Sequence, residues 1–170
     1  MPVWTIREAG IDELDRLIAL RRKMFESMRI EDAAALDRTC AAARIYFAEH
    51  MPTGAFHAYV GADERDNPIA SIGWVVHSTP PSPHNLVGKV GYVMNLVTLP
   101  QWRRRGIARA LLEHVLGVLR EQGIPVASLH ASAKGRQLYE DLGFEVRAAL
   151  PEMRIRLHPS SSTNSIPSGK

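Results

Sequence analysis

The sequence predicts one α/β domain built on a mixed β-sheet with flanking helices. Two apolar patterns indicate it: short alternating or continuous segments, as in strands, and longer segments with three-and-four spacing, as in helices. These segments are interleaved along the chain, which is typical of α/β architecture. The length of 170 residues fits one domain and is enough to bury a core. Apolar residues at 45% and charged residues at 23% exclude bulk disorder, collagen and coiled-coil rods.

The N-terminal half predicts a strand, two helices and two further strands. Residues 4–7 alternate as a strand, and residues 11–28 place apolar side chains along one face of an amphipathic helix. A second helix is expected over residues 31–50, where a following proline and glycine end it. Residues 56–60 and 69–76 read as a pair of strands joined by a polar turn.

The C-terminal half contains the most continuous apolar strand, residues 90–99, which is expected at the centre of the sheet. The remaining elements expected there are a loop over 78–85, a helix over 105–122, a strand over 126–131, a short helix over 134–142 and a final strand pair over 144–149 and 153–157. Residues 159–170 have almost nothing apolar to bury. The domain is therefore expected to span residues 1–158 and to be followed by a flexible tail.

The composition also excludes several classes of protein. No segment approaches the roughly 20 apolar residues that cross a bilayer, and residues 1–4 do not resemble the start of a signal peptide, so we expect a cytoplasmic protein without a membrane partner. The net charge of +3 is too small to indicate a nucleic-acid partner. The single cysteine, Cys40, excludes a disulfide scaffold and is expected to be a small buried hydrophobe. The scattered histidines form no ligand pair, so no metal site is expected.

A basic turn lies between the strand at 90–99 and the helix that follows it. A strand, a turn and a helix N-terminus in succession leave backbone N–H groups free to bind an anion. Gly106 allows close approach of the backbone to a ligand, and the three arginines at 103–105 add charge suited to phosphate. The turn lacks the Walker and Rossmann glycine patterns. A solvated arginine run is the alternative interpretation.

Residues 95–108 resemble the acetyl-CoA signature of the GCN5-related N-acetyltransferase (GNAT) family, Arg/Gln-x-x-Gly-x-Gly/Ala after an apolar strand. The resemblance implies a GNAT-like fold in which splayed central strands hold the cofactor, acetyl-CoA. It also implies that the turn binds the pyrophosphate and that the strand backbone at 96–98 pairs with the pantetheine arm. The cofactor-binding residues implied are Leu96, Val97, Thr98, Arg103, Arg104, Arg105, Gly106, Ile107, Ala108, Arg109, Ser132, Gly135 and Tyr139.

Residues 129–144 resemble the second motif of the family, Asn-x-x-Ala-x-x-x-Tyr-x-x-x-Gly-Phe. Tyr139 and the following Gly-Phe match in spacing. Ser132 replaces the usual asparagine, with a shorter reach toward pantetheine, and Gly135 replaces the usual alanine. Placed in this motif, Tyr139 is expected to be catalytic rather than only a packed aromatic.

Acetyl transfer to an amine requires a neutral amine, a stabilised oxyanion and a protonated thiolate. A tyrosine hydroxyl is a weaker acid than a thiol, so Tyr139 is the expected general acid. The base stays open among His130, Glu152 and an ordered water, because Asn95 stands where many family members carry glutamate and cannot take a proton. Asn95 is expected to orient the acceptor or a water.

The acceptor is expected to be a small-molecule or peptide amine. Side chains from the N-terminal helices and the strands are expected to line its pocket: Phe25, Met28, Trp74, His77, Tyr92 and Met94. The leading hypothesis is an acetyl-CoA-dependent N-acetyltransferase. A non-catalytic acyl-CoA sensor with the same fold remains the alternative, and a homodimer is left open. A nucleic-acid module is disfavoured, since the arginine run has no wider basic stripe.

Overall fold

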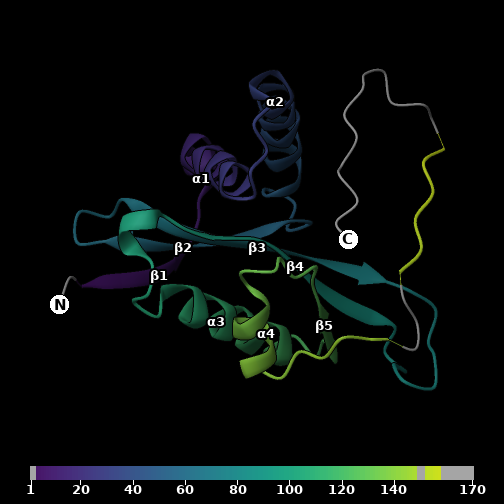
Figure 1. The fold of residues 1–170 in the computed structure, drawn as a ribbon. Helices are drawn as coiled ribbons and strands as arrows, with labels where there is room; N and C mark the ends of the chain where they lie inside the picture. Colours follow the sequence, from purple (N-terminus) through teal and green to yellow (C-terminus); the bar gives the residue numbers. More distant parts are fainter. Residues whose placement is uncertain (1–2, 149–151, 158–170) are drawn as a thin grey trace.

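The computed structural model describes residues 3–148 and 152–157, and they form one domain around a mixed five-stranded sheet (Figure 1). The strands are β1 (Trp4–Glu8), β2 (His57–Asp63), β3 (Pro68–Ser78), β4 (Lys89–Thr98) and β5 (Val126–Ser128). They lie in the order β1-β2-β3-β4-β5; the first four are antiparallel neighbours and β5 is parallel to β4. The predicted fold class is therefore confirmed.

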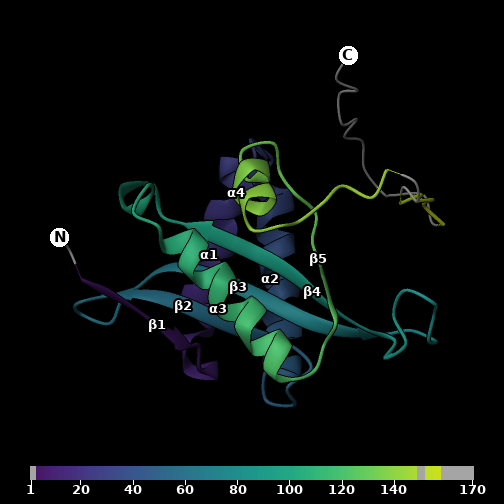
Figure 2. The same ribbon diagram turned by 90° about the horizontal axis from the view of Figure 1, so that it is seen from below.

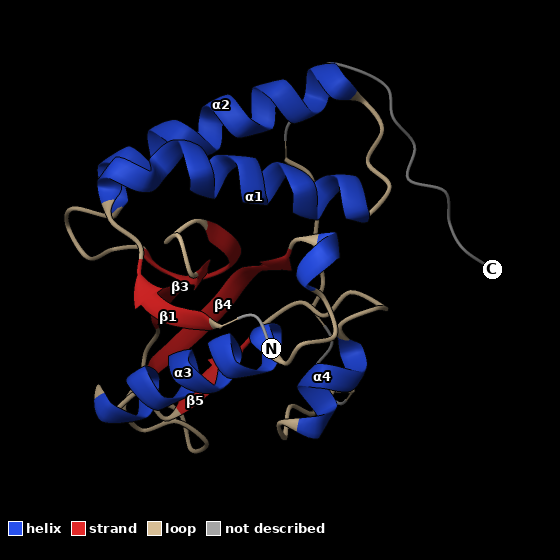
Figure 3. Ribbon diagram, turned by 90° about the vertical axis from the view of Figure 1, so that its left-hand side faces the viewer, coloured by secondary structure: helices blue, strands red, loops and turns tan. Residues whose placement is uncertain are grey.

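Helices cover both faces of this sheet. They are η1 (Ile11–Glu13), α1 (Leu14–Ser27), α2 (Ala33–His50), η2 (Pro100–Trp102), α3 (Ile107–Glu121) and α4 (Arg136–Asp141). Figure 1 and Figure 3 show α1 and α2 on one face and α3 on the other. Seen from below in Figure 2, α3 and α4 lie in front of the sheet. Helix α3 lies in the crossover connection from β4 to β5, because two parallel strands cannot be joined by a tight turn.

Two apolar clusters hold the helices to the sheet. Ile72 and Trp74 of β3 pack beneath α3, where Leu111 and Val115 are fully buried. Val75, the residue directly after Trp74, belongs to the cluster under α1 and α2, because successive strand residues face opposite sides. The middle strand β3 is thus the most buried one, whereas β4 lies second from the edge and is mostly half-buried.

Strand β4 carries an irregularity that positions the site described below. Its register with β3 runs from Gly73↔Met94 to Ser71↔Val97, so two β4 residues lie opposite a single β3 residue, which defines a β-bulge. Asn95 lies in this bulge with a φ of 57°. Asparagine is among the few residues that adopt this left-handed conformation readily.

Strands β4 and β5 pair only over three positions and then part. The ladder runs from Val90↔Val126 to Tyr92↔Ser128, whereas β4 continues to Thr98. The predicted strand at 126–131 is therefore shorter than expected. This parting leaves the second half of β4 without a neighbour on the β5 side among the described residues.

The predicted final strand pair is wrong within the described residues. Residues 144–148 and 152–157 contain no strand, and the end of the first predicted strand, residue 149, lies outside the described part. Three alternating apolar side chains there are exposed by 79–92%, so no second layer covers them: Met153, Ile155 and Leu157. The predicted tail at 159–170 also lies outside the described residues. Within residues 3–148 and 152–157, no helix is long and apolar enough to cross a membrane.

Candidate functional site

A cavity of about 450 Å³ lies at the end of β4, beyond the point where β5 departs. Its walls come from α1, β4, the basic turn, the start of α3 and the segment leading into α4. The lining residues are Met24, Ser27, Leu96, Val97, Thr98, Trp102, Arg103, Arg104, Gly106, Ile107, Ala108, Arg109, Ser132, Lys134, Gly135, Leu138 and Tyr139. Every residue that the sequence motifs implied for the cofactor is among them, except Arg105.

The basic turn presents its backbone to this cavity. Gly106 is the N-cap of α3 with a φ of 77°, and a Cβ built there would meet nothing within 4 Å. Arg103 is held by a hydrogen bond of 3.1 Å from its Nε to the Thr98 carbonyl. Arg105 points away instead: its guanidinium lies 4.8 Å over the Trp102 ring and donates to the Gln101 carbonyl. Glycine is thus required at Gly106 by conformation, and the space beside it belongs to the cavity.

The N-terminus of α3 and the side chain of Arg109 make this wall positive. The first N–H groups of a helix have no intrahelical acceptors, and the helix dipole adds partial positive charge there. Arg109 donates to Asp141 at 2.8 Å and so ties α3 to α4 across the cavity. Thr98 lines the cavity, and its hydroxyl is buried without a hydrogen-bond partner among the described residues. These groups fit a polar ligand with phosphates.

The opposite wall positions Tyr139. The Ser132 hydroxyl accepts a hydrogen bond of 3.2 Å from the Gly135 N–H, which fixes the turn before α4. A Cβ at Gly135 would lie 3.0 Å from Cε2 of Tyr139, so glycine makes room for this ring. Phe144 supports the ring from its edge, with centroids 6.0 Å apart. Burial raises the pKa of the Tyr139 hydroxyl, so it keeps its proton at neutral pH.

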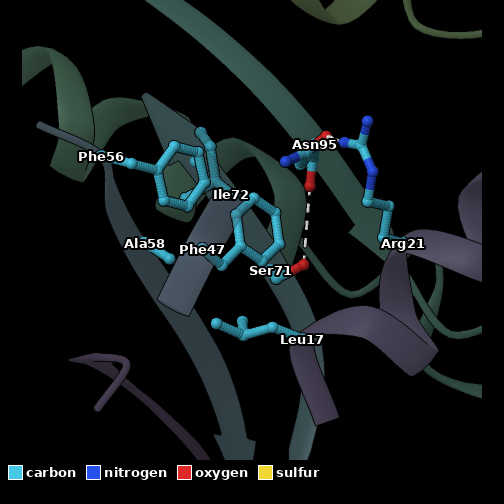
Figure 4. Close-up of a pocket in the computed structure, with 9 residues that line it drawn as sticks. Leu17, Arg21, Phe47, Phe56, Ala58, Ser71, Ile72 and Asn95 are labelled. Carbon is cyan, nitrogen blue, oxygen red and sulfur yellow. Dashed lines mark hydrogen bonds between the residues drawn. The ribbon is translucent and has the colours of Figure 1, made fainter. Parts of the chain in front are cut away.

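A cluster of polar side chains lies on the α1–α2 side of β4, at the bulge. Arg21 of α1 donates through Nη1 to the Asn95 side-chain oxygen, and the Ser71 hydroxyl donates to the Asn95 carbonyl at 3.5 Å. Figure 4 shows these groups at one end of a small hollow whose other end is apolar, with Leu17 and Phe47. The volume of this hollow is about 10 Å³. Sequence reasoning found Asn95 but missed Arg21.

The two predicted base candidates lie in one hydrogen-bonded chain. The Tyr92 hydroxyl lies 2.6 Å from His130 Nδ1, and His130 Nε2 contacts the Glu152 carboxylate. Arg154 donates to Glu152 at 2.7 Å, and hydrogen bonds first from Arg154 and then from His130 lower the pKa of that carboxyl. Burial and the negative charge of Glu152 raise the pKa of Tyr92. His77 stacks on the Tyr92 ring at 5.5 Å.

The acceptor-pocket candidates do not all share one face of the sheet. Tyr92 and Met94 pack toward α1 and α2, on the side of the Asn95 bulge. Phe25 lies under Arg21, with its ring centroid 4.9 Å from the guanidinium carbon, and Met28 is 53% exposed at the end of α1. Trp74 belongs to the cluster under α3 and is 1% exposed, so its side chain is closed to an acceptor in this conformation.

Several cavity residues were not identified from the motifs. Trp102, Lys134 and Leu138 lie inside the motifs, whereas Met24 and Ser27 come from α1. The signal that points to Arg21 is present in the sequence. It follows Leu17 by four residues and precedes Phe25 by four, and therefore places a cation on the apolar stripe of the helix.

A mixed sheet whose parallel strands part beside a basic, glycine-containing helix start defines an α/β protein of the acetyltransferase type. Residues 54–146 match the model of the acetyltransferase (GNAT) domain, and the chain belongs to this family. A comparison with curated protein sequences gave no match.

Solved structures with this fold resemble the chain over most of its length. A GCN5-related N-acetyltransferase from Ralstonia eutropha JMP134 is 29% identical, with a TM-score of 0.80 over 89% of this chain and 99% of that one. A predicted acetyltransferase with acetyl-CoA from Clostridium acetobutylicum is 24% identical, with a TM-score of 0.79 over 89% and 96%. The glucosamine-6-phosphate N-acetyltransferase of Arabidopsis thaliana is 16% identical, with a TM-score of 0.63 over 92% and 99%.

Proposed function

We propose that the protein is an N-acetyltransferase that uses acetyl-CoA to acetylate a primary amine by direct attack in a ternary complex. The observation that carries this proposal is the 450 Å³ cavity, which joins the β4 edge, the turn at Gly106 and Tyr139. The family assignment and the relative described with acetyl-CoA support the same ligand.

The residues present fit acetyl-CoA. The N–H groups at the start of α3, together with Arg103 and Arg104, would hold the pyrophosphate. The edge of β4 at 96–98, which β5 leaves open, would pair with the pantetheine amides, since an unpaired strand edge offers alternating donors and acceptors. When bound, acetyl-CoA supplies an acetyl group activated as a thioester.

Tyr139 is the proposed proton donor to the thiolate. Its hydroxyl is held on the cavity wall by Gly135 and Phe144, and burial raises its pKa. A donor must hold its proton until charge develops on the sulfur, and a tyrosine with a raised pKa does so at neutral pH. A backbone N–H of β4 beside the bulge is the proposed donor to the carbonyl oxygen.

The chain Tyr92–His130–Glu152 is the proposed acceptor of the amine proton. With Glu152 ionised and accepting from Nε2–H, His130 presents a lone pair on Nδ1 to the Tyr92 hydroxyl. As the Tyr92 oxygen takes the amine proton, the Tyr92 hydroxyl gives its own proton to Nδ1 in the same step, and Glu152 stabilises the resulting imidazolium. Tyr92 lies on the same side of β4 as Asn95, where the acceptor has access to the bulge.

Calorimetric titration with acetyl-CoA and desulfo-CoA tests the cofactor site. Gly106→Glu should abolish binding through steric block and charge repulsion. The matched control is Gly123→Glu, because Gly123 also has a positive φ of 69° and open space around it but does not line the cavity. Equal affinity for dephosphorylated pantetheine would contradict the role of the turn.

A thiol-release screen with acetyl-CoA and a panel of amines tests the activity. Release above the hydrolysis background with at least one amine is expected. Tight acetyl-CoA binding without release for any amine would instead favour the non-catalytic sensor.

A further inference from the structure

We infer that Arg21 binds a carboxylate of the acetyl acceptor, so that the acceptor class is an amine carrying a carboxylate close to its amino group. The inference rests on the proposed function, because it names the substrate of that reaction. It arises from a cation on the apolar side of α1 that the fold leaves without a counter-ion.

The three arginines of α1 differ in their partners. Arg16 lies 3.9 Å from a Glu13 oxygen, and Arg22 pairs with Asp37 at 2.6 Å and with Glu26 at 3.3 Å. Arg21 forms no ion pair with any described residue. Its Nη1 donates to the neutral side chain of Asn95, and its Nε is buried without a partner in the described part of the chain. Nη2 likewise makes no hydrogen bond there.

Burial makes this arrangement costly. Burial lowers the pKa of the Arg21 guanidinium, against a smaller opposing effect of Cys40. The rings of Phe25 and Phe47 lie 4.9 and 6.0 Å from its charge and stabilise it in part, but aromatic faces carry no formal negative charge. A buried charge is ordinarily paired, so a ligand anion is the missing partner.

The position of Arg21 matches an acceptor better than any part of the cofactor. Its guanidinium contacts Asn95, the residue directly before the β4 segment 96–98 that lines the large cavity. An anion bound there lies on the α1–α2 side of the bulge, the side of β4 on which the proposed proton acceptor Tyr92 packs. A short spacer between carboxylate and amine therefore brings the amine to the bulge.

The chemistry of the hollow favours a carboxylate over a phosphate. Arg21 is its single charged lining residue, which balances one negative charge. The volume of about 10 Å³ holds only one water-sized group, so the carboxylate would lie at the opening of the hollow, against Nη2, which makes no hydrogen bond in the described part of the chain. A planar carboxylate also suits the planar guanidinium, whose Nη2 is the group left without a hydrogen bond in the described part of the chain.

The test compares each acid with its own amide. Glycine, alanine and β-alanine are assayed against their carboxamides, with O-phosphoethanolamine as the phosphate arm, by thiol release and by calorimetric binding to the protein saturated with desulfo-CoA. The wild type should prefer at least one acid over its amide by about 10- to 100-fold in kcat/KM and in affinity, the size of a charge-assisted hydrogen bond. Preference for the phosphate arm, or equal use of acids and amides, overturns the inference.

Variants of Arg21 test whether this residue causes the preference for acids over their amides. Arg21→Met should remove the preference for the acid over its amide, whereas the adjacent control Arg22→Met should retain that preference. Arg21→Lys keeps a positive charge and should retain part of the preference for the acid. This variant is the one to compare with the wild type if Arg21→Met folds poorly. A preference that survives in both Arg21 variants overturns the inference. Absence of thiol release from these amines and from every amine of the wider panel contradicts the proposed function instead, and the binding measurement still decides whether Arg21 holds a carboxylate.

Discussion

Tyr139 is the residue on which the proposed chemistry depends most. Its hydroxyl adds one polar atom to a ring that already packs against Phe144 and fills the space above Gly135. Removal of that oxygen alone therefore tests the catalytic role of the hydroxyl and leaves the packing of the ring in place.

We expect Tyr139→Phe to lower kcat by about 10²–10⁴-fold, the usual contribution of a general acid, with little change in acetyl-CoA affinity or melting temperature. Tyr46→Phe is the control, because Tyr46 lies on α2 and does not line the cavity. Steady-state rates, calorimetry and thermal melts on both variants test this. A wild-type rate in Tyr139→Phe would show that another group protonates the thiolate. Because its pKa is raised, Tyr139 should cause no loss of wild-type rate until pH exceeds about 10.

At the scale of elements, one glycine of β4 allows α3 to approach the sheet closely, and a second glycine lies within α3 itself. Gly91 of β4 faces α3, and a Cβ there would lie 2.6 Å from Leu119, whose side chain is 2% exposed. Gly117 lies within α3, and a Cβ there would meet nothing within 4 Å. The same substitution at the two positions should therefore have opposite effects on stability.

We expect Gly91→Ala to lower the free energy of unfolding by about 1–3 kcal/mol through overpacking. Gly117→Ala should raise it by about 0.5–1 kcal/mol, because alanine restricts the unfolded chain and favours the helix. Urea titrations of the two variants measure both changes. Equal effects would mean that Leu119 moves aside without cost.

At the scale of the whole molecule, one ion-pair group joins the N-terminal strand to distant turns. Arg7 of β1 donates to both carboxylate oxygens of Glu13, at 2.6 and 2.8 Å, and to Asp66 of the β2–β3 turn at 2.7 Å. The Glu13 side chain is only 10% exposed. The hydrogen bonds from Arg7 lower the pKa of the Glu13 carboxyl below its ordinary value near 4.5.

A carboxyl whose pKa is lower in the folded state than in the unfolded state stabilises the fold above its unfolded pKa. That stability is lost as the pH falls through the folded value. We therefore expect the melting temperature to fall below about pH 4.5 and Glu13→Gln to weaken that dependence. At pH 7 the variant should lose about 1–3 kcal/mol. Glu49→Gln, exposed on α2 and without a hydrogen bond among the described residues, should change neither quantity.

The sequence correctly predicted the elements that depend on residues close together in the chain. The strand, turn and helix around Gly106 follow from consecutive residues, and the residues that the motifs implied for the cofactor line one cavity, except Arg105. The bulge at Asn95 was missed, because apolar periodicity carries no information about the register with β3. The contact between His130 and Glu152 joins separate segments and has no local signature. The final strand pair was wrong since the alternation at 153–157 does not reveal whether a neighbouring strand exists.

The short ladder between β4 and β5 has a consequence for how a ligand enters and leaves. Only three residue pairs, ending at Tyr92↔Ser128, join the strands beside the cavity, and each backbone hydrogen bond contributes only about 1 kcal/mol net. Local opening of β5 therefore costs far less than unfolding the layers around β3. The Arg109–Asp141 ion pair, 41–42% exposed, adds a weak tie between α3 and α4. Because β5 leads into the segment before α4 that lines the cavity, its local opening would allow ligand exchange without global unfolding.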